Sequence, residues 1–210
     1  ANDDSVQLSL PETKLGILPA WGGTTRLPRL IGADNAIDLI CSGRSVRPDE
    51  ALSLGLVDSL IPISNGTNLK DLSYEELASL TEGSIPALEQ ELEKRRTQKC
   101  SPLKLNMIES MMTFKLAKAM VAKKAGKNYP APLKALSVIE ECRKKDRDDA
   151  LEEEKRAFCE LVKTSASKSL IEIFFGERKL KATAQELASR VSMPQSVGVL
   201  GAGTMGAGIA

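Results

Sequence analysis

Two short segments of the sequence carry residues that could do chemistry, and the first contains a single carboxylate. Glu12 follows Pro11 at the end of a short run in which apolar residues alternate with polar ones. This period of two is typical of a strand with one buried face, so Glu12 is predicted just past a strand end. A carboxylate there could transfer a proton as an acid or base, or it could simply be solvated or cap a turn.

A pair of glycines follows this carboxylate in the stretch Pro-Ala-Trp-Gly-Gly at 19–23. Adjacent glycines allow positive φ angles and a close approach of the backbone to a ligand, so a tight loop is predicted. Thr24 or Thr25 is predicted to cap the short helix that comes next. Pro28 should lie in its first turn, because a proline deeper in the helix would break it.

The second chemical segment reads Gly-Ala-Gly-Thr-Met-Gly over 201–206 and directly follows an apolar run at 196–200. The run is predicted to be a short buried strand, and the glycines then open a helix. In the G-x-G-x-x-G pattern the first glycine makes the turn, the second lets the backbone approach a pyrophosphate, and the third lets the helix pack on the strand. The backbone N–H groups at the helix start would face the phosphates.

Composition limits the remaining function classes. The chain has 29 basic and 28 acidic residues and a formal net charge of +1, which argues against nucleic acid or an anionic membrane as the main partner. No integral membrane segment or signal peptide is predicted. The 4 cysteines form no Cys-x-x-Cys pair and histidine is absent, which argues against a zinc site and excludes a His-dependent triad within these residues. Reduced thiols suit a cytosolic compartment.

Helices are expected to position these segments, and the fold class is α/β overall but mostly α in this chain. Residues 129–132 are predicted to be an extended break because of their two prolines, and residues 177–194 to be a connector. We expect three regions, at 1–64, 65–194 and 195–210. The predicted helices cover 33–42, 48–54, 71–80, 85–96, 101–124, 133–143, 147–163 and 165–175.

A stripe of methionines occurs in the predicted helix 101–124 and has two interpretations. The simpler one is a packing stripe inside the protein. The other is a deformable wall for a fatty acyl chain, because methionine adapts to irregular apolar shapes. The stripe consists of Met107, Met111, Met112, Leu116 and Met120.

The stretch 11–32 resembles the crotonase superfamily of enoyl-CoA hydratases and isomerases. The resemblance continues through Gly43-Arg44, Pro48 to Ala51 and Gly55 to Asp58. It implies that Glu12 is the second of two catalytic glutamates and delivers a proton to the substrate Cα. It also implies that the backbone N–H of Ala20 orients the water. The family usually has glycine at this position, and its first glutamate and two oxyanion donors lie upstream of Ala1.

The glycine-rich end is similar to the opening of 3-hydroxyacyl-CoA dehydrogenases, and both resemblances occur in this order in multifunctional fatty acid β-oxidation enzymes. This implies that the chain is an internal piece: the C-terminal part of a crotonase fold, a helical connector and the first strand and turn of a Rossmann domain. NAD would be held by Gly201, Gly203, Met205 and Gly206, and Glu177 would contact the hydroxyacyl substrate.

The resemblance further implies acyl-CoA substrates, a thiolase subunit as partner, and a bacterial-type cytoplasmic location, with mitochondria and peroxisomes left open. Two other function classes stay open. One is a different crotonase reaction such as Δ3-Δ2-enoyl-CoA isomerisation, for which one glutamate can suffice. The other is an inactive helical scaffold or interaction module.

Overall fold

The computed structural model describes residues 5–61, 69–80, 85–100, 103, 107–188, 190 and 196–209. The chain divides into two compact units, Ala1–Ile171 and Glu172–Ala210. Among the described residues, no helix combines the length and the apolar character needed to cross a membrane.

The N-terminal part of the first unit begins with the only sheet in the described chain, a pair of two-residue strands. β1 (Leu8–Ser9) pairs antiparallel with β2 (Ser45–Val46), and Leu8 lies opposite Val46. The strand predicted before Glu12 is therefore present but short. The elements that follow are the 3-10 helix η1 (Pro11–Leu15) and the α-helices α1 (Gly23–Ile31), α2 (Ala33–Ser42) and α3 (Pro48–Ser53).

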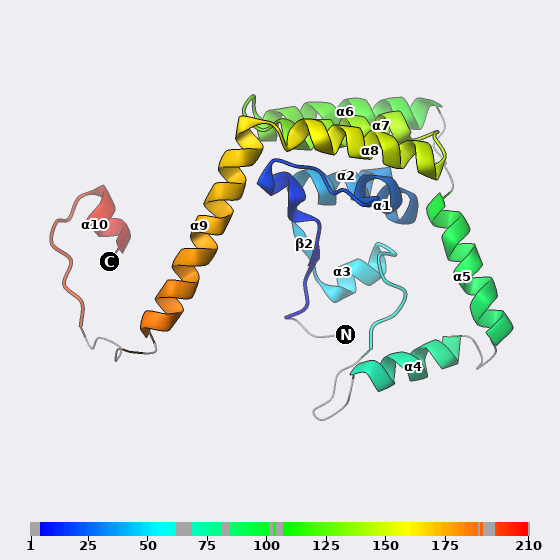
Figure 1. Ribbon diagram of the computed structural model, residues 1–210, viewed down its shortest axis with the longest axis horizontal. Coiled ribbons are helices and arrows are strands. Elements are labelled where there is room, and N and C mark those ends of the chain that lie inside the picture. The colour runs from blue at the N-terminus through cyan, green and yellow to red at the C-terminus, as the bar shows by residue number, and fades with distance from the viewer. Residues whose placement is uncertain are drawn as a thin grey trace. The chain divides into compact units, whose positions relative to one another are not determined.

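Helices make up most of the rest of the described chain, as expected, and Figure 1 shows α6, α7 and α8 side by side over α1 and α2. α7 is the centre of this arrangement, because it contacts α2, α6 and α8. The remaining elements are α4 (Leu69–Leu80), α5 (Ile85–Cys100), α6 (Met107–Ala125), α7 (Pro130–Cys142), α8 (Arg147–Leu161), α9 (Ser165–Ala188) and α10 (Thr204–Ile209).

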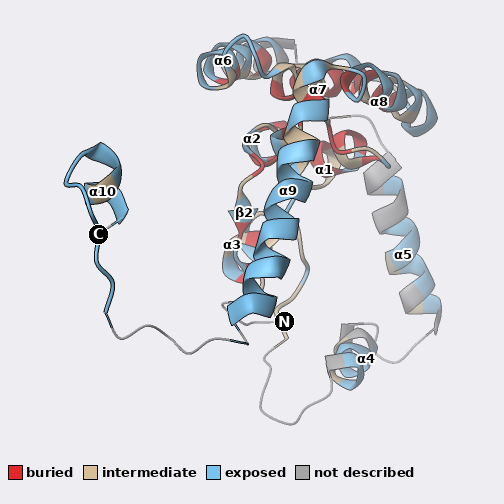
Figure 2. Cartoon of the chain, turned by 60° about the vertical axis from the view of Figure 1, so that its left-hand side comes forward, coloured by how far each residue is buried: buried red, intermediate tan, exposed pale blue. Residues whose placement is uncertain are grey.

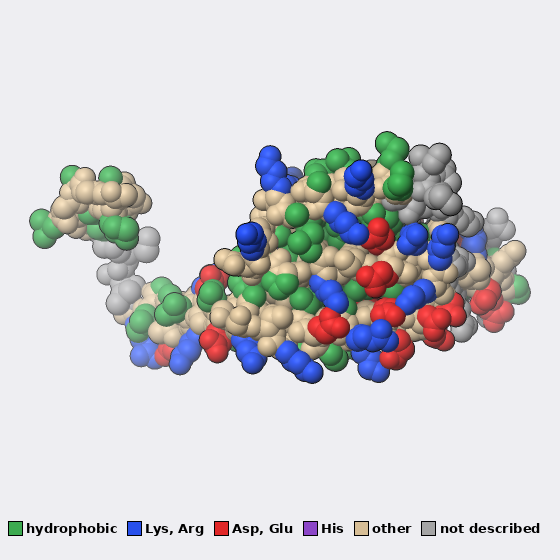
Figure 3. Space-filling view, turned by 90° about the horizontal axis from the view of Figure 1, so that it is seen from above, with side chains coloured by type: hydrophobic (Ala, Val, Ile, Leu, Met, Phe, Trp, Pro, Cys, Tyr) green, Lys and Arg blue, Asp and Glu red, His purple; other side chains and the backbone are tan. Residues whose placement is uncertain are grey.

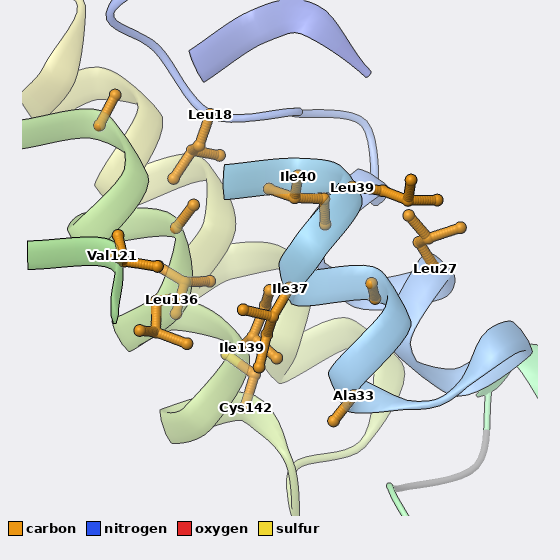
Figure 4. Packing of buried hydrophobic residues seen from close by; sticks show 14 of the residues in the cluster. Leu18, Leu27, Ala33, Ile37, Leu39, Ile40, Val121, Leu136, Ile139 and Cys142 are labelled. Carbon is orange, nitrogen blue, oxygen red and sulfur yellow. The ribbon is translucent and has the colours of Figure 1, made fainter. Parts of the chain in front are cut away.

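The hydrophobic core lies between these two layers, and its buried residues colour the facing sides of α1, α2, α7 and α8 in Figure 2. Figure 4 shows Ile37 of α2 beside Ile139 of α7, with Leu136 close by. These three side chains are at most 5% exposed. Full burial of one such side chain contributes roughly 1.5–3 kcal/mol, so this contact holds α7 on α2.

The outer face of the helical layer carries charges of both signs, interspersed as Figure 3 shows. Some of these charges link neighbouring helices: Lys118 of α6 pairs with Glu140 of α7 at 2.5 Å. Exposed pairs of this kind typically contribute less than about 1 kcal/mol each. The layer is therefore held mainly by its apolar inner face.

Two predictions about proline are wrong. The expected extended break at 129–132 is instead the start of α7, which begins at Pro130. A proline fits a first helical turn because its missing N–H would have no partner there. Pro28, in contrast, lies inside α1 instead of in its first turn, because α1 already begins at Gly23.

The predicted connector is also different. α9 does not stop at Gly176 but continues to Ala188. Residues 177–188 are rich in Lys, Ala, Glu and Leu, and such helix formers outweigh one glycine, which costs only about 1 kcal/mol. The strand predicted over 196–200 is absent: these residues have no regular structure and are exposed. A strand needs a neighbour for its backbone hydrogen bonds, and within the described chain this segment has none.

Candidate functional site

Glu12 lies on η1, directly after β1, and the surrounding backbone is fixed. The hydroxyl of buried Thr13 donates to the carbonyl of Ile40 in α2 at 2.7 Å. At the other end, Gly16 lies against the first turn of α9, where a Cβ on it would come within 2.7 Å of the Ser167 Cα. These two contacts fix the backbone of η1, from which the Glu12 side chain projects.

The Glu12 carboxylate has an unusual environment. Its Oε2 atom is buried and has no hydrogen-bond partner among the described residues, although the residue as a whole is only partly buried. Buried polar atoms are nearly always hydrogen-bonded, so an exception needs an explanation. An oxygen held ready for a proton, a water molecule or a substrate is one such explanation, and it suits an acid/base group.

The predicted tight loop follows at 19–23, and two of its residues have left-handed backbone angles: Trp21 with φ +55° and Gly22 with φ +89°. The N–H groups of Gly23 and Thr24 donate to the carbonyls of Ala20 and Pro19, which closes the turn. The Arg26 guanidinium donates to the carbonyl of Trp21. Trp21 itself is 88% exposed, so its ring does not hold the loop.

A carboxylate from a distant helix holds this loop, and sequence reasoning missed it. Glu154 of α8 is 2% exposed and accepts hydrogen bonds from the N–H of Gly22 at 2.5 Å and the N–H of Thr24 at 3.0 Å. The Thr24 hydroxyl also donates to it, at 2.5 Å. The prediction that Thr24 or Thr25 caps α1 is wrong: both threonines lie inside the first turn, and Glu154 is the acceptor for the helix start.

A signal for Glu154 was present in the sequence. Residues 150, 154, 157 and 161 repeat at helical spacing, and three of them are Ala150, Ala157 and Leu161. The carboxylate thus lies on the face of α8 that is otherwise apolar and buried. A charge in a buried register indicates a buried hydrogen-bonding partner, because an unpaired buried charge is too costly.

The other predicted site residues belong to the second unit. Glu177 is exposed inside α9 and does not mark a helix end. In the glycine-rich segment, Gly201 has φ +100°, and a Cβ on Gly206 would lie 1.7 Å from the Gly201 carbonyl oxygen. The turn therefore requires glycine at both positions. Gly203 has open space, and Met205 is 78% exposed. NAD binding here remains a prediction.

A cavity of about 1120 Å³ lies between α2, α6 and the start of α7. The packing interpretation of the methionine stripe is not confirmed, because Met112, Leu116 and Met120 line this cavity and are 55–65% exposed. Among the α6 residues whose burial is described, Phe114 and Val121 are buried in the core. The acyl-wall interpretation stays a prediction.

A known protein family matches most of the first unit. The site residues of this unit, Glu12 with one buried and unpartnered oxygen and the glycine loop at 19–23, both lie within the matched range. The model of the enoyl-CoA hydratase/isomerase family matches residues 1–130, which is more than half of the chain. The chain therefore belongs to this family, and its chemistry is of the crotonase type, as in fatty acid β-oxidation. α7 begins at the end of the matched range, and α8 and α9 lie beyond it.

Proposed function

We propose that the protein containing this chain hydrates trans-2-enoyl-CoA to 3-hydroxyacyl-CoA and then oxidises this product to 3-oxoacyl-CoA with NAD. The chain would be an internal piece of a multifunctional β-oxidation enzyme. The observation that carries the first activity is the buried and unpartnered Oε2 of Glu12 in a member of the enoyl-CoA hydratase/isomerase family.

Hydration requires a proton at Cα and a hydroxyl at Cβ as the double bond becomes single. Glu12, as the protonated acid, would deliver the proton to Cα. The second carboxylate, expected upstream of Ala1, would take the proton that the attacking water loses, so the atoms of one water molecule are accounted for. The Ala20 N–H would orient that water. Backbone donors on the thioester oxygen, also expected upstream, would each contribute about 3 kcal/mol.

The second activity is supported by the glycine-rich turn of the second unit. The left-handed angle of Gly201 and the close approach of Gly206 to its carbonyl fit a pyrophosphate-binding turn. Gly201, Gly203, Met205 and Gly206 would hold NAD, which when bound accepts a hydride from the substrate. Glu177 would contact the hydroxyacyl group. A thiolase partner and a cytoplasmic location complete the proposal.

A second candidate is Δ3-Δ2-enoyl-CoA isomerisation. It is supported by the unpartnered Oε2 of Glu12, because moving one proton between two carbons can use a single carboxylate. The candidates differ in substrate: the isomerase acts on a 3-enoyl-CoA and adds no water. A helical scaffold without activity would leave the unpaired Glu12 oxygen unexplained.

The test is Glu12→Gln in the full-length protein, with Glu50→Gln as the matched control. Glu50 lies on α3 in the same unit and pairs with Arg44 at the surface. We expect Glu12→Gln to lower hydration of crotonyl-CoA at least about 100-fold, as for loss of a positioned acid/base. Oxidation of 3-hydroxyacyl-CoA and the control should be unaffected. Wild-type protein that isomerises a 3-enoyl-CoA but never hydrates a 2-enoyl-CoA would support the second candidate instead.

A further inference from the structure

The peptide unit between Trp21 and Gly22 is held at both of its polar ends. Its carbonyl accepts from the Arg26 guanidinium, and its N–H donates to Oε1 of Glu154 at 2.5 Å. This peptide plane cannot rotate without breaking both hydrogen bonds. This matters because the left-handed angle of Trp21 is uncommon and unfavourable for a residue with a side chain, whereas Gly22 adopts such an angle readily.

Glu154 uses its two oxygens for different parts of the loop. Oε1 accepts from Gly22, whereas Oε2 accepts from the N–H and the hydroxyl of Thr24. The first N–H groups of a helix have no partner within the helix, so a carboxylate at this end both satisfies them and is favoured by the helix dipole. Glu154 thus fixes the loop and the start of α1 together.

The burial of Glu154 makes this arrangement specific. At 2% exposure its charge has little contact with water, and a buried carboxylate is stable only when it is hydrogen-bonded. In the observed conformation the loop supplies one of those donors, the Gly22 N–H, and α1 supplies the others from Thr24 and Thr25. Any other arrangement of residues 20–22 would leave the carboxylate with fewer partners, so the loop has one strongly preferred state.

We propose that Glu154 is a positioning residue for the hydration reaction: it fixes the loop that carries the Ala20 N–H and thereby the place of the attacking water. This inference rests on the proposed hydratase function. The Ala20 N–H belongs to the peptide two units before the held one, and the turn hydrogen bonds from Gly23 and Thr24 to the carbonyls of Ala20 and Pro19 link the two. A misplacement of about 1 Å in a reacting group can lower a rate about 100-fold. The controlling group lies on α8, outside the family-matched residues 1–130.

The experiment compares Glu154→Ala and Glu154→Gln in the full-length protein. Glutamine retains one acceptor oxygen, so it should restore part of what alanine loses. Two variants on the same helix serve as controls. Glu153→Gln removes a carboxylate that pairs with Lys145 and Arg156 at the surface. Leu161→Val trims a buried side chain without touching the loop.

We expect the kcat for hydration to fall about 10- to 100-fold in Glu154→Ala and less in Glu154→Gln, with KM within about threefold of wild type. The rate of 3-hydroxyacyl-CoA oxidation should be unchanged. In hydrogen-exchange measurements, the peptide that covers residues 19–26 should lose protection in the Glu154 variants alone. Both controls should keep wild-type kcat and protection, even where the melting temperature falls.

The outcomes separate this inference from the proposed function. If wild type hydrates enoyl-CoA and Glu12→Gln does not, but Glu154→Ala keeps full kcat, the positioning role is wrong and the hydratase stands. A loss of kcat that Leu161→Val reproduces at equal melting temperature also overturns it, because stability alone would then explain the effect. If wild type does not hydrate at all, the proposed function fails, and the catalytic role of Glu154 fails with it. Glu154→Gln decides the matter if the alanine variant does not fold.

Discussion

Two glycine-rich turns in this chain lead into a helix, and their surroundings are opposite. The turn at 19–23 leads into α1, and its helix start meets the buried carboxylate of Glu154. The turn at 201–206 leads into α10, and its residues are exposed apart from the partly buried Gly206. Both turns use glycine in left-handed conformations, at Gly22 and Gly201. The same local pattern therefore precedes one helix start whose N–H groups donate to a protein carboxylate and one helix start that is exposed to solvent.

The comparison distinguishes the backbone conformation of a glycine-rich turn from the acceptor that its N–H groups bind. Unpaired N–H groups at a helix start need an acceptor, which can come from the protein or from a ligand. Within the first unit, the protein supplies the acceptor, so the turn becomes a rigid part of the proposed site. In the second, the pyrophosphate of NAD would take that role in the proposed function. The first turn should thus be sensitive to changes within the fold, and the second to changes that affect the ligand.

The largest expected effect is on the exposed turn at 201–206. Gly203→Val in the full-length protein should weaken NAD binding about 100-fold or more and lower 3-hydroxyacyl-CoA oxidation, because a side chain would fill space needed by the pyrophosphate. Among the described residues other than its chain neighbours, no heavy atom lies within 4 Å of a Cβ on Gly203, so the fold itself should tolerate the change. Calorimetry with NAD and assays of both reactions on one preparation provide the measurement.

Gly198→Val is the matched control for this prediction, because its added Cβ also meets open space but lies outside the fingerprint. Hydration should be largely spared in both variants. Unchanged NAD affinity in Gly203→Val would mean that the segment is only a turn. Loss of both activities in a folded protein would contradict the assignment of the two turns to separate sites.

The second prediction concerns the turn at 19–23, which donates hydrogen bonds to Glu154. Gly22→Ala places a Cβ 2.5 Å from the Arg26 guanidinium at φ +89°, whereas Gly126→Ala adds a Cβ in open space at φ +66°. The control should cost about 1–2 kcal/mol for the left-handed angle alone. Gly22→Ala should cost about 0.5–1.5 kcal/mol more, because the exposed Arg26 side chain must move and lose its hydrogen bond to the Trp21 carbonyl. Urea unfolding of the three proteins measures the difference, and equal costs would mean that Arg26 can move away freely.

The contrast between the turns also shows which features the sequence predicts. α2 is found at its predicted bounds, because Gly43 ends it in a left-handed conformation. The position of Glu12 after a strand and the loop at 19–23 follow from local patterns in the same way. Each of these features depends on residues close together in the chain, which is where propensity and turn chemistry are informative.

Features that depend on distant partners were not predicted. The cap of α1 comes from Glu154, which is separated from the loop by most of the first unit and lies in a run of charges typical of a solvated face. Pro28 is inside α1 because the helix begins at Gly23 instead of after Thr24 or Thr25. The apolar run at 196–200 has the composition of a strand, but a strand also requires a partner. Long-range contacts decided all three cases.

A smaller effect is expected at Trp21, which has φ +55° and is 88% exposed. Asparagine tolerates this conformation better than tryptophan, so Trp21→Asn should raise the free energy of unfolding by about 0.5–1 kcal/mol. The loss of apolar contact should be small at this exposure. Chemical denaturation is the measurement. A clear loss of stability would show that contacts of the Trp21 ring fix the loop in addition to the hydrogen bonds of its peptide to Arg26 and Glu154.

The smallest expected effect tests whether removing Glu154 frees only the loop. Cys142 of α7 is 4% exposed, and its Sγ lies 3.8 Å from the carbonyl of Ala150 in α8, so its protection reports the docking of these helices. Burial raises the pKa of Cys142 from 9.0 to about 11. Between these values the folded state binds more protons than the unfolded state, so stability falls as pH rises through this range and is unaffected by this thiol below it.

Alkylation at pH 8 therefore avoids that range, and only about one in a thousand Cys142 thiols is ionised there in the folded state. Exposed Cys159 of α8 should react first in every variant. In Glu154→Gln, the rate at Cys142 should stay within about twofold of wild type, because the apolar face of α8 still packs on α7. Rapid labelling of Cys142 would show that α8 separates from α7 when its carboxylate is lost. The fixed conformation of the loop at 19–23 would then result from the docking of α8 on α7. In that case the two turns would differ because of helix packing more than because Glu154 accepts hydrogen bonds at the start of α1.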